Sequence, residues 1–212
     1  FISNCCLIIY FHCMKNEKSF LDKISNTNYY NVKNPKINIS PIQFFVSKIL
    51  LQKKKKGELL LRQGDVCDKM YYFEKGLVKV FATQNDNEVA TWFSKEGDFL
   101  TLVNSFNYGV PSHESIEVLE DISYYAIPKN YYFQLLDFSS QISLFTMFEM
   151  LKNVCEYQTQ TIMLRTMKSQ DRYNYFVEHY ADLIDRINQK DLASFIGLDE
   201  TYLSKIINDS KK

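Results

Sequence analysis

The chain has 212 residues, 46% of them hydrophobic and 24% charged, and its 25 basic and 25 acidic side chains cancel. This composition is typical of a globular chain with one large domain or two small ones, and it excludes collagen, a disordered tail and a disulfide miniprotein. The longest uncharged apolar stretch, residues 5–11, is far shorter than the roughly twenty residues of a membrane-spanning helix. The odd count of five cysteines indicates no disulfide framework, so we expect a cytoplasmic protein.

The charges are unevenly distributed along the chain. Residues 1–57 carry ten lysines and two acidic residues, whereas residues 58–130 carry six basic and twelve acidic residues. Because the total is zero, bulk charge does not by itself indicate a polyanion-binding protein.

The first 41 residues are predicted to be a leader, partly disordered or helical. They lack the pattern of a secretory signal, and Met14 is the expected start of translation. Composition and the breakers Pro35 and Pro41 leave room for one short helix near residues 19–24. Residues 42–51 are predicted to form another helix, which is followed by the run Lys53 to Lys56. Four consecutive lysines most simply form a solvated face, with phosphate contact as the alternative.

From Glu58 to Pro128 the pattern changes to short β-branched and aromatic runs. Turn signals separate these runs at the spacing of an antiparallel sandwich or barrel. The predicted strands are residues 58–62, 70–74, 77–83, 89–94, 115–118 and 123–127. We therefore predict a compact β domain over residues 42–138, which closes with a short helical segment at 131–138.

A long helix is predicted over residues 139–168, because the apolar period becomes 3.6. A heptad seam runs along it and consists of Leu144, Phe148, Leu151, Cys155, Gln158 and Ile162. The neighbouring Met147, Val154 and Met163 widen this seam. Such a seam favours a homodimer through this helix. The alternative is that the helix merely packs on its own β domain.

The remaining residues, 169–212, are predicted to be all-helical. The expected helices are residues 170–187, 189–196 and 200–208, and Ser169, Asn188 and Asp199 are positioned to cap them. Overall we expect an α+β protein: an antiparallel, jelly-roll-like β-roll sensor domain, a long dimerisation helix and a small all-α helix-turn-helix domain.

The segment Gln189 to Asn208 carries the sharpest functional signal. Ala193 is small where two helices would cross, and Gly197 supplies the turn. Apolar residues stand where the two helices must pack together: Leu192, Ile196, Leu198, Leu203 and Ile206. The free polar face of the second helix is typical of a helix that enters the major groove. We assign DNA contacts to Lys190, Glu200, Thr201, Tyr202, Ser204, Lys205 and Asn208.

The charge of this segment favours an alternative. Residues 187–212 hold four lysines and four acidic residues, so their attraction to phosphate is weak. A dimeric sensing or interaction module that has lost DNA binding is therefore the rival hypothesis. An ordinary helical hairpin is the simplest structural alternative.

With these features in this order, the chain from about Lys53 onward resembles the Crp/Fnr family of bacterial transcription regulators. The stretch GELLLRQGDVCDKMYYFEKGLVKVF, residues 57–81, is similar to the opening of the family's cyclic-nucleotide-binding β-roll, with Gly64 and Gly76 at its two turns. The QK-x-LAS-x-IG pattern, followed by Leu203-Ser204-Lys205-Ile206, is similar to the Bacteroidetes branch. The resemblance implies a homodimer on an inverted-repeat operator in double-stranded DNA, a small-molecule effector and RNA polymerase as a candidate contact.

The effector implied by this resemblance is not cyclic AMP. Members that bind cyclic AMP hold its ribose with a Glu and its phosphate with an Arg-Ser pair. Alignment on Gly97 places Leu102 at the Glu position and Ser112-His113 at the Arg-Ser positions. A desolvated phosphate without a guanidinium is costly, and a histidine is mostly neutral near pH 7. The expected effector pocket is therefore Gly97, Leu102, Ser112 and His113, with an unknown ligand.

Other chemistries find little support in the sequence. The cysteines lack the spacing of iron–sulfur ligation, and no catalytic motif is present. A metal-dependent jelly-roll enzyme would need clustered ligands, but His12, His113 and His179 lie in three different segments. We therefore expect no enzymatic activity, no metal, no cofactor and no membrane association.

Overall fold

The structure is a computed structural model, and it describes residues 49–85, 87–138 and 140–209. The predicted leader, the short helix at 19–24 and most of the predicted helix at 42–51 lie outside the described residues.

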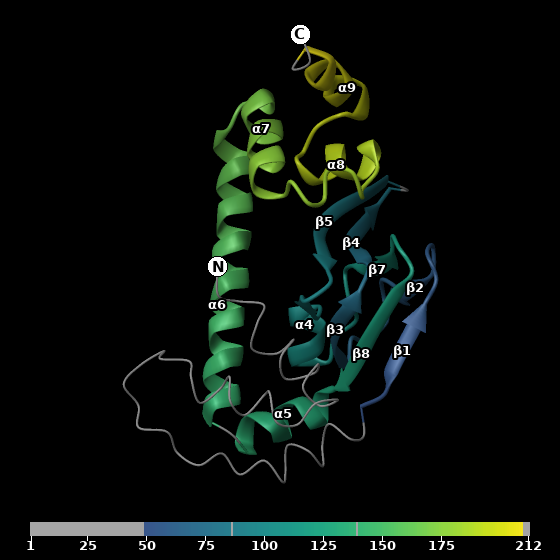
Figure 1. Cartoon of the computed structure of the whole chain (residues 1–212), viewed down its shortest axis with the longest axis vertical. Helices are drawn as coiled ribbons and strands as arrows, with labels where there is room; N and C mark the ends of the chain where they lie inside the picture. Colours follow the sequence, from purple (N-terminus) through teal and green to yellow (C-terminus); the bar gives the residue numbers. More distant parts are fainter. Residues whose placement is uncertain (1–48, 86, 139, 210–212) are drawn as a thin grey trace.

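Within these ranges, eight strands form two antiparallel four-stranded sheets that face each other as a β-roll (Figure 1). The first sheet has the order β1 (Leu51–Lys54), β8 (Ile122–Pro128), β3 (Lys69–Lys75) and β6 (Phe99–Leu100). The second has the order β2 (Leu59–Leu61), β7 (Ser115–Val118), β4 (Leu77–Gln84) and β5 (Asn87–Lys95).

All six predicted strands are present, and two strands were not predicted. The two-residue β6 is too short to leave a pattern. The predicted helix that ends at Leu51 is wrong at its end, because Ile49 and Leu50 are not helical and β1 begins at Leu51. This segment pairs with β8, with Leu51 opposite Tyr125. Tertiary pairing thus overrides the local helical pattern.

The core of the β-roll lies between the two sheets. Side chains from both sheets meet there, including Tyr71 and Phe73 of β3 and Val78 and Val80 of β4. The turn between these two strands requires Gly76. Its φ is +93°, and a Cβ at this position would lie 2.7 Å from the carbonyl oxygen of Asp121. The predicted turn at Gly76 therefore has a steric reason.

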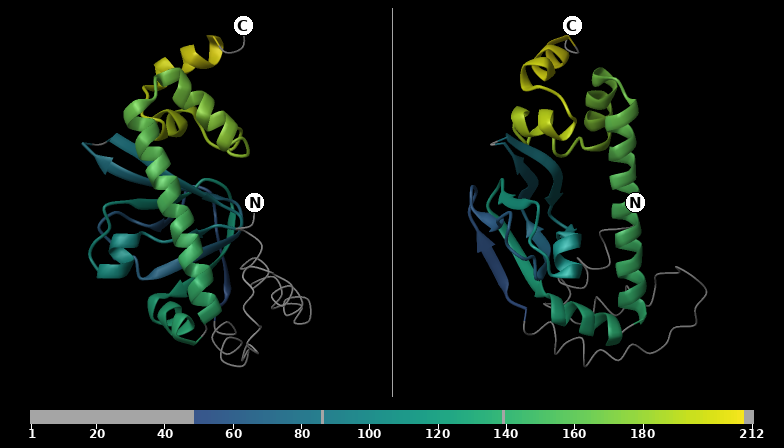
Figure 2. Two further views of the ribbon diagram at one scale, coloured as in Figure 1. Left: turned by 90° about the vertical axis from the view of Figure 1, so that its left-hand side faces the viewer. Right: turned by 180° about the vertical axis from the view of Figure 1, so that it is seen from behind.

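Helices accompany the β-roll along one side and at one end (Figures 1 and 2). The short α4 (Val103–Tyr108), which was not predicted, interrupts the strands, and α5 (Lys129–Phe138) follows β8. The long α6 (Ser140–Thr166) then runs along the side of the β-roll, from α5 at one end to α7 at the other. Its 27 residues correspond to a length of about 40 Å, and its bounds are close to the predicted residues 139–168.

Three further helices lie at the far end of α6: α7 (Ser169–His179), α8 (Gln189–Phe195) and α9 (Glu200–Asp209). Two predictions about α7 are wrong. The residue before the helix is Lys168 rather than Ser169, and the helix ends at His179 rather than at Ile187. Residues 181–186 form turns instead, because Asp182 and Arg186 there form ion pairs with the β-roll.

Candidate nucleic-acid interface

Both helices of the α8–α9 pair begin at a side-chain cap, as predicted. The carboxamide oxygen of Asn188 accepts a hydrogen bond from the backbone N–H of Asp191 at 2.7 Å. Asp199 Oδ1 accepts hydrogen bonds from the N–H groups of Thr201 (2.9 Å) and Tyr202 (3.2 Å). These bonds satisfy N–H groups that have no partner inside their own helix.

The turn between the two helices depends on Gly197. Its φ is +66°, and a Cβ would lie 3.1 Å from both Arg172 Nη1 and Leu164 Cδ2. Arg172 Nη1 also donates hydrogen bonds to the carbonyl oxygens of Ile196 and Gly197. The turn is therefore held against α6 and α7, and the predicted apolar positions Leu192, Ile196, Leu203 and Ile206 are buried.

All but one of the predicted DNA-contacting residues are exposed. The side chains that reach solvent are those of Lys190, Glu200, Thr201, Tyr202, Lys205 and Asn208. Ser204 is half-buried, and its hydroxyl accepts a hydrogen bond from Gln189 Nε2. The same nitrogen donates to the carbonyl oxygen of Glu200 at 3.1 Å. Sequence reasoning missed Gln189, because its contacts lie 11 and 15 residues away, in the next helix.

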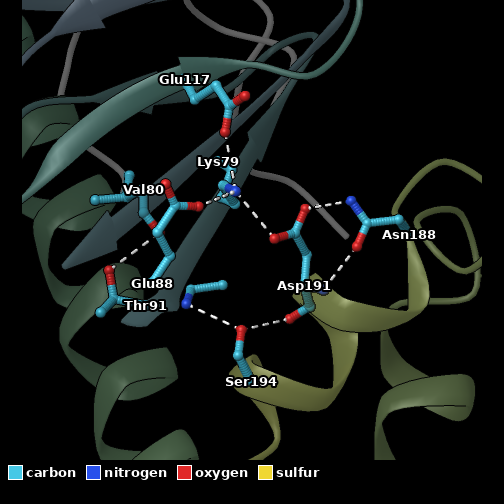
Figure 3. A network of polar contacts seen from close by, with 9 residues as sticks. Lys79, Val80, Glu88, Thr91, Glu117, Asn188, Asp191 and Ser194 are labelled. Carbon is cyan, nitrogen blue, oxygen red and sulfur yellow. Dashed lines mark hydrogen bonds and ion pairs between the residues drawn. The ribbon is translucent and has the colours of Figure 1, made fainter. Parts of the chain in front are cut away.

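A buried ion cluster attaches α8 to the β-roll (Figure 3). Lys79 of β4 extends its ammonium group toward three carboxylates. Its Nζ lies 2.9 Å from Asp191 of α8, 2.9 Å from Glu117 of β7 and 3.5 Å from Glu88 of β5. Burial disfavours the charged ammonium, but the hydrogen bonds that it donates to Glu117 and Asp191 outweigh this effect, so the pKa of Lys79 lies above its ordinary value. The lysine therefore stays charged at neutral pH.

Apolar and hydrogen-bonded contacts surround this ion cluster. Phe93 of β5 packs on Phe195 of α8, with ring centroids 5.2 Å apart. Ser194 Oγ accepts a hydrogen bond from the N–H of Ala90 at 3.1 Å. Leu77, Ala90 and Phe93 belong to the same buried cluster as residues of α6, α7, α8 and α9. The outer face of the second sheet and the C-terminal helices thus share one hydrophobic core.

A second set of ion pairs secures the turn after α7. Arg186 donates to both carboxylate oxygens of Glu96 at 2.9 Å and to those of Glu120 at 2.8 and 2.7 Å. The side-chain hydrogen bond to Arg186 lowers the pKa of Glu120 and, against the effect of burial, that of Glu96. Lys95 forms an ion pair with Asp182 in the same region.

The long helix has two different faces. On the face toward the β-roll, Tyr157 packs on Trp92 of β5, and Gln160 Nε2 donates to the carbonyl oxygen of Thr91 at 3.3 Å. Apolar side chains of the opposite face are exposed: Met147, Met150, Leu151, Val154 and Ile162. The assignment of Met163 to the seam is wrong, because it is 2% exposed inside the C-terminal core. The side chains of Leu144 and Phe148 lie outside the described part of the structure.

The residues of the predicted effector pocket occupy different environments. Leu102 is buried in the β-roll core at the start of α4, and Gly97 donates its N–H to the carbonyl oxygen of Phe73 at 2.8 Å. Ser112 is buried and hydrogen-bonded to the backbone of Glu114, whereas His113 is exposed.

Glu114 was missed by the sequence reasoning. Its carboxylate accepts a hydrogen bond from Thr91 Oγ1 at 2.6 Å, beside the contact with α6. Burial, with added repulsion from this carboxylate, raises the pKa of Tyr157 to about 12. A carboxylate thus lies two residues after Ser112.

None of the helices among the described residues is long and apolar enough to cross a membrane. Among the same residues, no group of three or more His, Cys, Asp or Glu side chains is arranged to hold a metal ion.

Comparison with known proteins relates the β-roll to one domain family. Residues 51–138 match the family model of the cyclic nucleotide-binding domain. No curated protein sequence matches the chain significantly.

Solved structures extend the similarity of fold to the helices. CLP of Xanthomonas campestris, a c-di-GMP-responsive global regulator, is 15% identical with a TM-score of 0.68, over 82% of this chain and 92% of CLP. FixK2 of Bradyrhizobium japonicum is 13% identical with a TM-score of 0.66, over 76% and 83% of the two chains. A transcriptional regulator of the Crp/Fnr family from Thermus thermophilus is 18% identical with a TM-score of 0.59, over 76% and 84%. The chain has the fold of these regulators.

Proposed function

We propose that this chain, whose residues 51–138 match the cyclic nucleotide-binding domain, is a sequence-specific DNA-binding transcription regulator of Crp/Fnr type. The observation that carries the proposal is the exposed polar surface of α9. The caps of α8 and α9 and the glycine turn between the two helices position this surface at the end of the molecule. A second helix with such a face, packed on a first across a tight turn, suits insertion into the major groove.

The proposed contacts to DNA are the predicted ones: Lys190, Glu200, Thr201, Tyr202, Ser204, Lys205 and Asn208. Thr201, Tyr202 and Lys205 are exposed on α9 and supply donors and acceptors for base edges. Ser204 is already held by Gln189, so this contact requires the serine hydroxyl to donate while it accepts from the amide.

A homodimer through α6 is the second part of the proposal. Its support is the apolar face that points away from the β-roll, on which Leu151 and Val154 are 51% and 59% exposed. A row of such side chains suits burial against a second copy of the same helix. Two copies of α9 would then read an inverted repeat.

The effector is proposed to be a small molecule other than cyclic AMP. Support comes from Leu102, which is buried in the core, and from Ser112, whose hydroxyl is bound to backbone groups. Neither supplies the charge that the resemblance requires for cyclic AMP. Contact with RNA polymerase stays a prediction. The similarity to the Bacteroidetes branch and the domain boundaries at residues 41, 138 and 168 also stay predictions.

One observation favours a second candidate function. At α9 the exposed residues include the acidic Asp199 and Glu200 as well as the basic Lys205, so the surface attracts phosphate only weakly. A dimeric sensing or interaction module without DNA binding would have the same fold.

Selection from random duplex DNA, followed by titration of the recovered sequence, separates the two functions. For the regulator, we expect an inverted repeat to be enriched. Lys205→Ala should weaken binding to it by about 1–3 kcal/mol, with little effect on unrelated duplex, if Lys205 contacts a base. Lys75→Ala, which removes an exposed lysine of the β-roll outside the run Lys53 to Lys56, is the matched control. Recovery of no preferred sequence would favour the module without DNA binding.

A further inference from the structure

Strand β5 connects the two elements that matter most for reading DNA. Its Thr91 and Trp92 contact α6, while the neighbouring Ala90 and Phe93 contact α8. The orientation of the α8–α9 pair relative to α6 therefore depends on how α8 sits on the outer face of β4 and β5.

The apolar part of this contact does not define an orientation by itself. Phe93, Leu192 and Phe195 lie in one hydrophobic cluster. Burial of apolar surface is non-directional, so a helix that rotates or slides on such a surface loses little as long as the area stays covered. A contact that fixes the angle has to be polar and buried.

Lys79 and Asp191 form such a contact. Their side chains are only 5% and 8% exposed, and Lys79 Nζ lies 2.9 Å from Asp191 Oδ1. Asn188 Nδ2 donates to the other carboxylate oxygen of Asp191 at 2.7 Å, which holds the acceptor in place (Figure 3). If α8 docked in another position, Lys79 would keep Glu117 and Glu88, but Asp191 would be buried without its lysine, at a cost in free energy.

We propose that Lys79 and Asp191 are positioning residues that fix the angle of α9 relative to α6, and thereby the half-site spacing that a dimer reads. The inference rests on the proposed function. Fixing the angle in each protomer fixes the separation of the two α9 helices across the dimer. Each base pair inserted between half-sites moves one of them by about 3.4 Å and rotates it by about 35°.

The test uses the inverted repeat recovered by the wild-type chain, with the central spacer lengthened or shortened one base pair at a time. Fluorescence anisotropy gives the ratio of affinities between the preferred spacer and its neighbours. We expect a sharp preference in the wild type. In Lys79→Met the ratio should fall by about tenfold, which equals about 1.4 kcal/mol of lost preference, while affinity for non-preferred spacers is kept.

A double variant separates orientation from stability. Lys79→Met leaves Asp191 buried without its lysine and is expected to be less stable. Lys79→Met/Asp191→Leu replaces the two buried groups by apolar ones, which proteins often tolerate, and the carboxylates of Glu117 and Glu88 that also lose the lysine are partly exposed to solvent. The double variant should melt near the wild-type temperature and still show the relaxed spacer preference. If the single variant does not fold, the double variant carries the test. Lys69→Met, which breaks the exposed pair with Asp68, is the matched control and should keep the sharp preference.

Three results would overturn the inference: a wild type that is indifferent to spacer length, a folded double variant with the wild-type preference, or a folded double variant that binds none of the spacers. Failure of the proposed function looks different, because the wild type would then select no sequence at all.

Discussion

Trp92 of β5 and Tyr157 of α6 lie with their ring centroids 4.6 Å apart and their planes tilted by 32°. This pair is part of the contact between the β-roll and α6. It lies on a different face of α6 from the exposed apolar row. Because the chain has a single tryptophan, the fluorescence of Trp92 reports on this one contact.

Removing the ring of Tyr157 should loosen α6 from β5. We expect Tyr157→Ala to lower the free energy of unfolding by about 1–3 kcal/mol, since an aromatic pair contributes about 0.5–1.5 kcal/mol beyond its buried area. Urea denaturation followed by Trp92 fluorescence measures the loss. Tyr157→Phe keeps the ring and should change stability little; an equal loss in both variants would contradict a role of ring packing.

Gly76 should tolerate substitution far less than Gly64. Both have a φ above +90°, but a Cβ at Gly76 would lie 2.7 Å from a backbone oxygen, whereas a Cβ at Gly64 meets nothing within 4 Å. Gly64→Ala therefore adds backbone strain alone, about 1–2 kcal/mol, and Gly76→Ala adds a steric clash to it. Thermal unfolding of the two variants compares them, and similar melting temperatures would argue against the clash.

Glu156 should destabilise the fold at neutral pH. Burial raises its pKa and Asp98 adds repulsion, against attraction from Lys152. With the folded pKa above the ordinary value of 4.5, the charged form is disfavoured in the folded state at pH 7, and this cost disappears as the pH falls through the folded pKa. Glu156→Gln should therefore raise stability at pH 7 and lose this advantage toward pH 4.5. Glu178→Gln, at an exposed site, is the control; a pH-independent gain for Glu156→Gln would contradict the assignment.

Leu151→Lys should break the proposed dimer. The wild type is expected to sediment as a dimer at micromolar concentration, and a charge in the exposed row opposes burial of that row against a second helix. Thr83→Lys introduces the same side chain at an exposed site of β4, outside α6, so it should remain dimeric. A monomeric wild type would contradict the dimer through α6.

Cyclic AMP should leave the melting temperature unchanged. A specific ligand at 100 times its dissociation constant adds about 2.7 kcal/mol to the folded state, which thermal unfolding detects readily. With Leu102 packed in the core and Ser112 bound to its own loop, the phosphate would have no cationic partner from these positions. A clear upward shift at millimolar cyclic AMP would contradict this prediction.

The local sequence determined six of the eight strands that the structure describes and most of the helices. Residues 70–74 and 77–83, with Gly76 between them, are recognisable because alternation and a turn residue are properties of neighbours along the chain. The caps at Asn188 and Asp199 and the turn at Gly197 are equally local, and they place the exposed residues of α9 on one face.

Tertiary structure decided what joins these parts. Leu51–Lys54 became a strand through pairing with β8, and α7 stopped at His179 because Asp182 and Arg186 bind the β-roll. Lys79 and Asp191 are 112 residues apart, and each looks like an ordinary surface charge in its own segment. Only the packing of α8 on β4 and β5 brings them together. Each charge can be buried because the other is its partner, and no local sequence pattern indicates that partner.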